Sequence, residues 1–197
     1  KRNMKGLVNM EITNKHPKIY LLSGKARNGK DTTAEFLKKF YEADGKKVIY
    51  SRAGKYIKFY ASEMTGWDGK EETKPRQLLQ ELGTDVIRNK LNKADMLIER
   101  QLDDIEIYSY FYDAIIVPDI RLPKEIDSVK AKFDNVVAIH INRINFESDL
   151  SSNQQSHITE TAMDNYTNFD YEVTNDTLEQ LEKDIYKIYK EETKWKS

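Results

Sequence analysis

The sequence predicts a three-layer α/β sandwich, in which helices cover both faces of a parallel five-stranded sheet. Five short apolar runs have the length of strands and lie at 18–23, 47–51, 113–118, 136–142 and 170–174. Helical patterns alternate with them and lie at 30–43, 55–64, 75–90, 94–103, 123–133 and 177–192. Such alternation is typical of α/β proteins. The runs "AIIV" and "VVAI" lack apolar–polar alternation, which indicates strands that are buried on both faces.

Local signals support the individual elements. The first strand contains the letters "IYLL" and leads through a loop with two glycines into the helix at 30–43. Pro123 suits the first turn of the next-to-last helix, where a missing backbone N–H costs nothing. The buried side of the last helix is predicted by apolar residues at helical spacing, namely Leu178, Leu181, Ile185 and Ile188.

Two intervals depart from this alternation. Roughly sixty residues separate the second and third strands, whereas a crossover between parallel strands needs about a dozen. We therefore expect a helical insertion at about 55–105 that binds the acceptor of a reaction. The polar stretch at 145–157 is rich in Ser, Asn and Gln and predicts a lid-like loop. Residues 1–17 are weakly patterned, and we expect a polar lead-in to a single domain at 18–192.

Length and composition narrow the range of functions. A chain of 197 residues fits one domain with a substantial core. Its formal net charge of -1 gives no general attraction for nucleic acid or membranes, so we expect neither as a partner. The chain contains no cysteine, which excludes thiolate catalysis and disulfides and fits a cytoplasmic protein. The apolar runs are too short to span a bilayer.

A phosphate-binding motif follows the first strand. The letters "GKARNGK" at Gly24–Lys30 satisfy G-x-x-x-x-G-K between a predicted strand and a predicted helix. The glycines let backbone N–H groups point at phosphate oxygens, the helix adds its positive end, and the lysine reaches the β and γ oxygens. A plain glycine turn is the alternative. We expect the nucleotide to contact Gly24, Lys25, Arg27, Asn28, Gly29, Lys30, Asp31, Thr32 and Thr33.

Asp31 occupies the position where the usual motif has serine or threonine. Its simpler role is a favourable interaction with the helix dipole. The alternative is that the Asp31 carboxylate and the Thr32 hydroxyl help to hold Mg²⁺, because both are hard oxygen ligands. The sequence leaves both roles open, with the dipole role favoured.

The phrase "SGKARNGKDTTAEFL" resembles the deoxynucleoside monophosphate kinase family of phages and bacteria, within the adenylate kinase-like superfamily. The segments "RQLLQELGTDVIR", "VPDIRLPKEID" and "HITETAMDNYTNFDYEVTNDTLEQL" are similar to other parts of that family. The segment "RAGKYIKFYA" departs from it, since relatives tend to read "FADPLK" there. The resemblance implies a P-loop NTPase fold with strand order 2-3-1-4-5. It also implies transfer of the γ-phosphoryl group from ATP, with Mg²⁺, to a (deoxy)nucleoside monophosphate.

Four residues are candidates for the catalytic step. Asp119 lies at the carboxyl end of the third strand, where ligands bind in open α/β sheets. Its carboxylate can organise Mg²⁺ or orient the acceptor, and its alternative role is to cap the helix at Pro123. Arg121 follows two residues later and suits phosphate oxygens, with a surface ion pair to Glu125 as the alternative. Arg143 follows the fourth strand, and together with Lys30 these arginines would offset charge on the transferred group.

The acceptor site is predicted within the insertion. Arg76, Gln80 and Thr84 have i, i+4, i+8 spacing and share a helix face, while Arg88 lies beyond an expected helix break at Gly83. An amphipathic helix with a solvated polar face is the alternative. Lys58 is a weaker candidate for the acceptor phosphate. Arg52 is a second candidate for the acceptor phosphate. The resemblance implies that His157 and Glu160 belong to the mobile wall over the nucleotides. Asn175 is expected to bind the nucleotide, because the resemblance implies backbone contact with adenine at the turn of Asn175 and Asp176, and helix capping is the alternative.

Two other functions remain open at this point. One is a P-loop kinase that acts on another small phosphate ester, of the phosphomevalonate or dephospho-coenzyme A type. The other is a non-catalytic nucleotide sensor, which would need no acceptor pocket. The sequence also leaves open whether the chain forms a homodimer.

Overall fold

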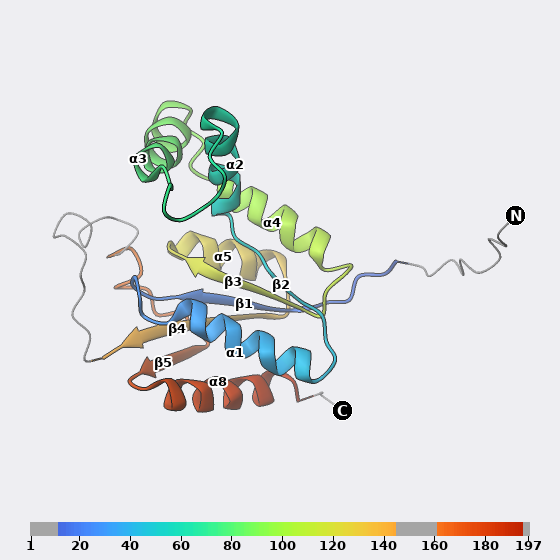
Figure 1. Cartoon of the computed structure of the whole chain (residues 1–197). Coiled ribbons are helices and arrows are strands. Elements are labelled where there is room, and N and C mark those ends of the chain that lie inside the picture. The colour runs from blue at the N-terminus through green and yellow to red at the C-terminus, as the bar shows by residue number, and fades with distance from the viewer. Residues whose placement is uncertain (1–11, 145–160, 195–197) are drawn as a thin grey trace, which may run out of the picture.

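The computed structural model describes residues 12–144 and 161–194 and has the predicted α/β architecture (Figure 1). Its strands are β1 (Lys18–Ser23), β2 (Val48–Tyr50), β3 (Ala114–Ile120), β4 (Val136–Arg143) and β5 (Tyr171–Asn175). Its helices are α1 (Lys30–Ala43), α2 (Gly54–Thr65), α3 (Arg76–Gln80), the π-helix η1 (Glu81–Lys90), α4 (Met96–Tyr108), α5 (Pro123–Lys132) and α8 (Leu178–Glu192). The strands form one sheet in the order β2-β3-β1-β4-β5. This order confirms the prediction of a P-loop NTPase fold.

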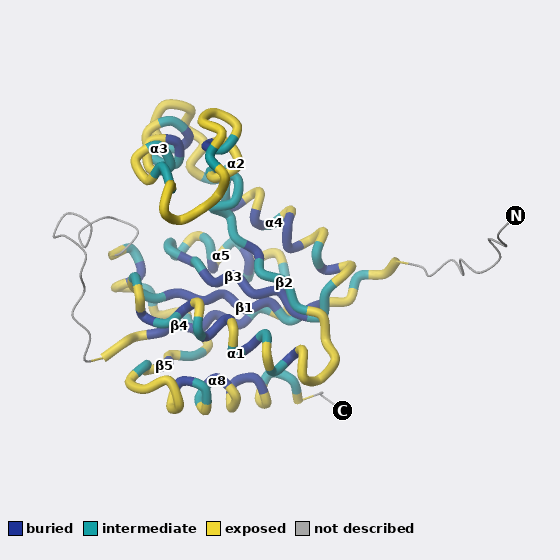
Figure 2. Tube along the Cα trace, in the orientation of Figure 1, coloured by how far each residue is buried: buried dark blue, intermediate teal, exposed yellow. Residues whose placement is uncertain are grey.

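The central strand β1 shows why the strands lack polar alternation. It pairs in parallel with β3 and β4, and β2 and β5 pair in parallel at the edges. Tyr20 and Leu22 pack in a core cluster with residues of α1 and α8. Ile19 and Leu21 point to the opposite cluster, which contains residues of α4 and α5. Both faces of the sheet are therefore covered at its centre, as Figure 2 shows by the burial of β1 and β3.

The last helix departs from the prediction at its first residue. Leu181, Ile185 and Ile188 are buried as expected, but Leu178 is 63% exposed. Leu178 is the first residue of α8, directly after the N-cap Thr177, so it lies before the turns that cover the sheet. Tyr189 is buried in its place, and its spacing of four from Ile185 keeps it on the same face.

The insertion consists of α2, α3, η1 and α4, and its first three helices project away from the sheet (Figure 1). The helix expected at 75–90 continues through Gly83 as a π-helix, so the predicted break there is wrong. A Cβ at Gly83 would lie 2.9 Å from Ile57 Cδ1. The glycine therefore permits close contact between η1 and α2 instead of ending the helix. Within residues 12–144 and 161–194, no helix combines the length and apolar character needed to cross a membrane.

Candidate active site: a phosphate loop beside a polar pocket

The loop between β1 and α1 has a shape that requires its glycines. Gly24 has φ 143° and Gly29 has φ 101°, conformations that glycine adopts far more readily than other residues. A Cβ at Gly24 would lie 2.3 Å from Ile141 O, and one at Gly29 would lie 2.5 Å from Asn175 Nδ2. The loop therefore rests directly against β4 and the end of β5, with no room for a side chain at either glycine.

Three predicted site residues hold this loop in place. Asn28 Nδ2 donates a hydrogen bond to Ile141 O at 3.1 Å, and Asn175 Nδ2 donates to Asn28 O at 2.9 Å. Arg143 Nη1 donates to Arg27 O at 3.3 Å. Strands β4 and β5 thus fix the backbone whose N–H groups are predicted to face phosphate.

The Lys30 ammonium lies over the same loop. It donates hydrogen bonds to Gly24 O at 2.7 Å and Lys25 O at 2.8 Å, although Lys30 is only 8% exposed. The burial of the residue and these two short bonds fix the position of its charge at the N-terminus of α1. Lys25 itself points outward and forms an ion pair with Asp164 at 3.2 Å.

A cluster of charges lies where α1 begins and β3 ends. Asp31 forms an ion pair with Arg52 at 2.7 Å, a partner that follows β2 and that the sequence ranked only as a weak candidate. Burial raises the pKa of Asp119, and the positive charges of Arg52, Arg121 and Lys58 oppose that rise, while Asp31 adds to it. The predicted residues from these separate elements therefore influence one partly buried carboxylate.

Glu125 organises the turn that presents Arg121. Its Oε2 accepts hydrogen bonds from the backbone N–H of Arg121 at 2.6 Å and of Leu122 at 2.9 Å. Burial raises the pKa of Glu125, and these two bonds oppose the rise. Because Glu125 makes the capping bonds at the start of α5, capping does not require Asp119.

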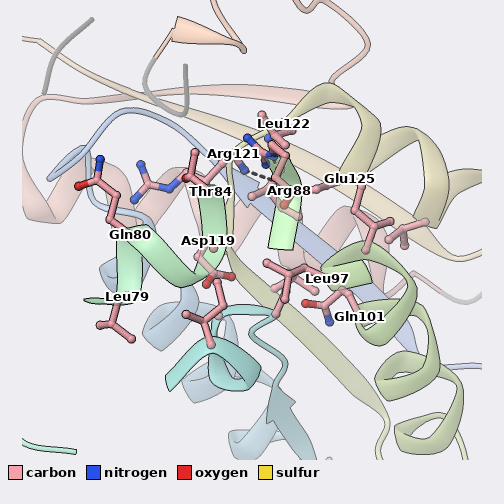
Figure 3. A pocket seen from close by; sticks show the side chains of 18 residues that line it. Leu79, Gln80, Thr84, Arg88, Leu97, Gln101, Asp119, Arg121, Leu122 and Glu125 are labelled. Atoms are coloured by element: carbon pink, nitrogen blue, oxygen red, sulfur yellow. Dashed lines mark hydrogen bonds between the residues drawn. The ribbon is translucent and has the colours of Figure 1, made fainter. Parts of the chain in front are cut away.

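A pocket of about 350 Å³ lies between the insertion and the carboxyl end of β3 (Figure 3). This volume is within the range of small-molecule sites. One wall is apolar and includes Leu97 and Ile98 of α4. The polar and charged side chains that line the pocket are Gln80, Thr84, Arg88, Gln101, Asp119, Arg121 and Glu125. Six of these seven residues lie in the segments "RQLLQELGTDVIR" and "VPDIRLPKEID". Gln101 lies outside them, and the sequence did not indicate it, because a single amide in a helix gives no periodic signal.

The structure does not bring every predicted residue to this pocket. Arg76 forms an ion pair with Glu71, in the loop before α3, and is not among the residues that line the pocket. Lys58 is exposed on α2 and also lies outside the lining. Lys55 lies in the segment "RAGKYIKFYA", which departs from the family resemblance. It forms an ion pair with Asp104 of α4 at 2.6 Å. The predicted loop at 145–157 and the candidates His157 and Glu160 lie outside the described residues.

The fold and this site define the class of protein. Shikimate kinase from Aquifex aeolicus has the same fold, with a TM-score of 0.52 and 14% identity, and the match covers 88% of this chain and 96% of that one. APS kinase from Mycobacterium tuberculosis gives a TM-score of 0.51 and 10% identity, with 88% and 97% covered. The chain thus has a P-loop kinase fold.

Sequence comparison places the chain in one family among the proteins with a P-loop kinase fold. A family model for deoxynucleotide monophosphate kinase matches residues 47–185, and the chain belongs to this family. The deoxynucleotide monophosphate kinase of Enterobacteria phage T4 is 34% identical over 107 residues, which cover 54% of this chain. The match spans 41% of the length of that relative.

Proposed function

We propose that this chain transfers the γ-phosphoryl group of ATP to the phosphate of a deoxynucleoside monophosphate. The products are ADP and the corresponding deoxynucleoside diphosphate. The observation that carries this proposal is the position of the pocket: it is lined by Ile120 at the end of β3, which pairs with Ser23 at the end of β1, where the phosphate loop begins. An acceptor in the pocket would therefore lie beside a donor on the phosphate loop. Family membership supports the same reaction.

The reaction depends mainly on the positioning of the two phosphate groups and on compensation of their negative charge. The loop from Gly24 to Gly29 would surround the donor phosphates, with Lys30 beside it. Arg121 and Arg88 line the pocket and would bind the acceptor phosphate or the group in transfer. Arg143 supports the loop through Arg27 O. Planar guanidinium groups suit these tasks because they donate several hydrogen bonds in a fixed geometry.

The residues beside the phosphate loop fit a magnesium ion. Thr33 Oγ1 is buried and has no hydrogen-bond partner within the described part of the chain, so an oxygen ligand is available close to Asp31 and Thr32. Magnesium needs only one or two protein oxygens, because phosphates and water complete its shell. No group of three or more His, Asp or Glu side chains in the described ranges forms a separate metal site. Asp31, Thr32 and Asp119 are the residues that would hold Mg²⁺, with the Thr33 hydroxyl as a further oxygen beside them, and the chemistry that the ion would supply is neutralisation of phosphate charge.

A coupled assay of ADP release tests the proposed reaction. The protein is incubated with ATP, Mg²⁺ and each deoxy- and ribonucleoside monophosphate in turn, with phosphomevalonate and dephospho-coenzyme A as further acceptors. We expect ADP release that depends on a deoxynucleoside monophosphate, and product analysis should identify the diphosphate. ATP binding without ADP release from any acceptor would contradict the proposal and favour a sensor. Release only with one of the non-nucleotide esters would favour the other kinase class.

A further inference from the structure

A buried amide on the pocket wall has an unused hydrogen-bonding group. Gln101 of α4 is only 5% exposed and lines the pocket. Its Nε2 donates to Ser51 Oγ at 2.6 Å. Its Oε1 is also buried, and among the described residues no group donates a hydrogen bond to it. A buried carbonyl oxygen without a donor is unfavourable and uncommon in folded proteins, so this atom calls for an explanation.

The surroundings of Gln101 are largely apolar. Leu97 lies beside Gln101 in Figure 3, and Ile98, Val117 and Val129 also line the pocket. The charged residues Arg88 and Arg121 lie together in another part of the same view. The pocket therefore has a charged region that suits a phosphate and an apolar region that contains a single buried amide. These are the two environments that a nucleotide requires.

Ser51 fixes the orientation of the amide. It is 1% exposed, directly follows β2, and its backbone N–H donates to Ile116 O at 2.9 Å. The hydroxyl that receives the Gln101 Nε2 bond is thus held by the sheet itself. With Nε2 engaged there, Oε1 is the atom of the amide that has no partner among the described residues. Such a preorganised acceptor can discriminate between ligands, because its position is set before binding.

We propose that Gln101 determines which nucleobase the acceptor site prefers, with Oε1 accepting a hydrogen bond from an N–H group of the base. Ser51 is the positioning residue for this contact. The inference rests on the proposed function and adds to it the group that recognises the base, which is Gln101 Oε1. Ring and exocyclic N–H groups differ in position among the four bases, so a fixed oxygen favours the base whose N–H reaches it. A site built around a hydrogen bond rejects ligands that leave its buried group unpaired.

Gln101→Met tests the proposal, because methionine has a similar volume and removes both polar atoms. Steady-state kinetics are measured with the four deoxynucleoside monophosphates at saturating ATP. We expect kcat/KM for the preferred base to fall roughly 10- to 100-fold, the effect of one buried hydrogen bond, while the preference among bases shrinks. The loss should appear mainly in the KM for the acceptor, with the KM for ATP unchanged. Gln180→Met, at a glutamine exposed on α8, is the matched control.

A purely structural role for Gln101 predicts a different result. It would lower the melting temperature and reduce kcat/KM for all four bases by one common factor. An unchanged ratio between the best and worst base in Gln101→Met would therefore overturn the inference, even if total activity fell. If the wild-type protein phosphorylates no nucleoside monophosphate, the proposed function fails first, and that outcome is visible before any variant is made.

A second measurement uses the wild-type protein and does not depend on the folding of a variant. The preferred substrate is compared with its analogue in which the base N–H groups of the pairing edge carry methyl groups. We expect the methylated analogue to bind at least tenfold more weakly to the wild type. We also expect Gln101→Ala, which removes the acceptor and creates space, to lose most of that discrimination. Equal affinity of the wild type for both ligands would refute a hydrogen bond from the base.

Discussion

Asn175 at the end of β5 donates a hydrogen bond to the backbone carbonyl of Asn28, 147 positions earlier in the chain. The same amide nitrogen would lie 2.5 Å from a Cβ at Gly29. The shape of the phosphate loop therefore depends on a strand that is distant in sequence. This contact gives Asn175 a structural role in addition to the predicted contact with adenine, which remains a prediction.

Gly29→Ala should weaken both folding and ATP binding. The new methyl group meets Asn175 Nδ2, and a residue other than glycine at φ 101° is strained, so we expect a loss of about 2–4 kcal/mol in the free energy of unfolding. Gly45→Ala is the matched control, because Gly45 also has positive φ but has no atom near its Cβ position. Gly45→Ala should lose about 1 kcal/mol in the free energy of unfolding. Adding Asn175→Ala to Gly29→Ala should recover part of the difference, as measured by urea unfolding.

Lys30→Ala should abolish turnover while the fold is retained. The ammonium of Lys30 is fixed over the phosphate loop by two carbonyl groups, and removal of such a preorganised charge costs about 100-fold or more in kcat. Lys39→Ala changes an exposed lysine on the same helix, which pairs with Glu182, and should leave kcat within twofold. The ADP-release assay and the melting temperature are measured for both. A wild-type rate in Lys30→Ala would remove the role assigned to that residue.

Arg88→Ala should weaken binding of the acceptor. Arg88 lines the pocket, and loss of one charged hydrogen-bond donor to phosphate is expected to raise the KM for the acceptor by about 10- to 100-fold. The KM for ATP should change little, because the phosphate loop does not include η1. Arg100→Ala, an exposed arginine of α4, serves as the control. An unchanged acceptor KM in Arg88→Ala would place the acceptor phosphate elsewhere.

Asp119→Asn should raise the melting temperature and lower the kinase activity. Burial raises the pKa of Asp119, so its folded-state pKa exceeds the unfolded value and the charged carboxylate destabilises the fold at neutral pH. The asparagine variant should therefore melt at a higher temperature at pH 7, by about 2–4 °C for each 1 kcal/mol gained. It should also lose most kinase activity.

The pH dependence of the increase in melting temperature tests the assigned pKa shift of Asp119. The carboxyl group contributes stability that is fully present below its unfolded pKa and is lost as the pH rises through the folded value. The advantage of Asp119→Asn should consequently shrink as the pH falls toward 3.8, the ordinary value for aspartate. Scanning calorimetry of both proteins between pH 7 and mildly acid pH measures this trend. An advantage that grows on acidification would contradict the assigned direction of the pKa shift.

The sheet and the phosphate loop could be predicted from sequence because their signals are local. Buried parallel strands are continuous apolar runs, and the loop needs glycines at fixed spacing. The end of α4 was harder to predict. The sequence predicts a helix that ends at 103, but α4 continues to Tyr108, and Ile105 in this extra turn packs into the core. Tertiary contact thus overrode local propensity.

The candidate site was less predictable than the fold. The sequence spacing placed Arg76 with Gln80 and Thr84, but Arg76 begins α3 and reaches the loop before it, where it pairs with Glu71. The contact of Gln101 with Ser51 joins residues 50 positions apart. No periodicity in a single sequence reveals such a pair, because it depends on how the insertion packs against the sheet.

The close contact of Gly83 with Ile57 limits the space available at one wall of the pocket, because both residues line it. A Cβ at position 83 would lie 2.9 Å from Ile57 Cδ1, so a larger residue there would require the Ile57 side chain to move. Substitution of Gly83 should therefore change the shape of the pocket on the side of η1 and α2. Gln101 lies on α4, so its substitution leaves this contact unchanged.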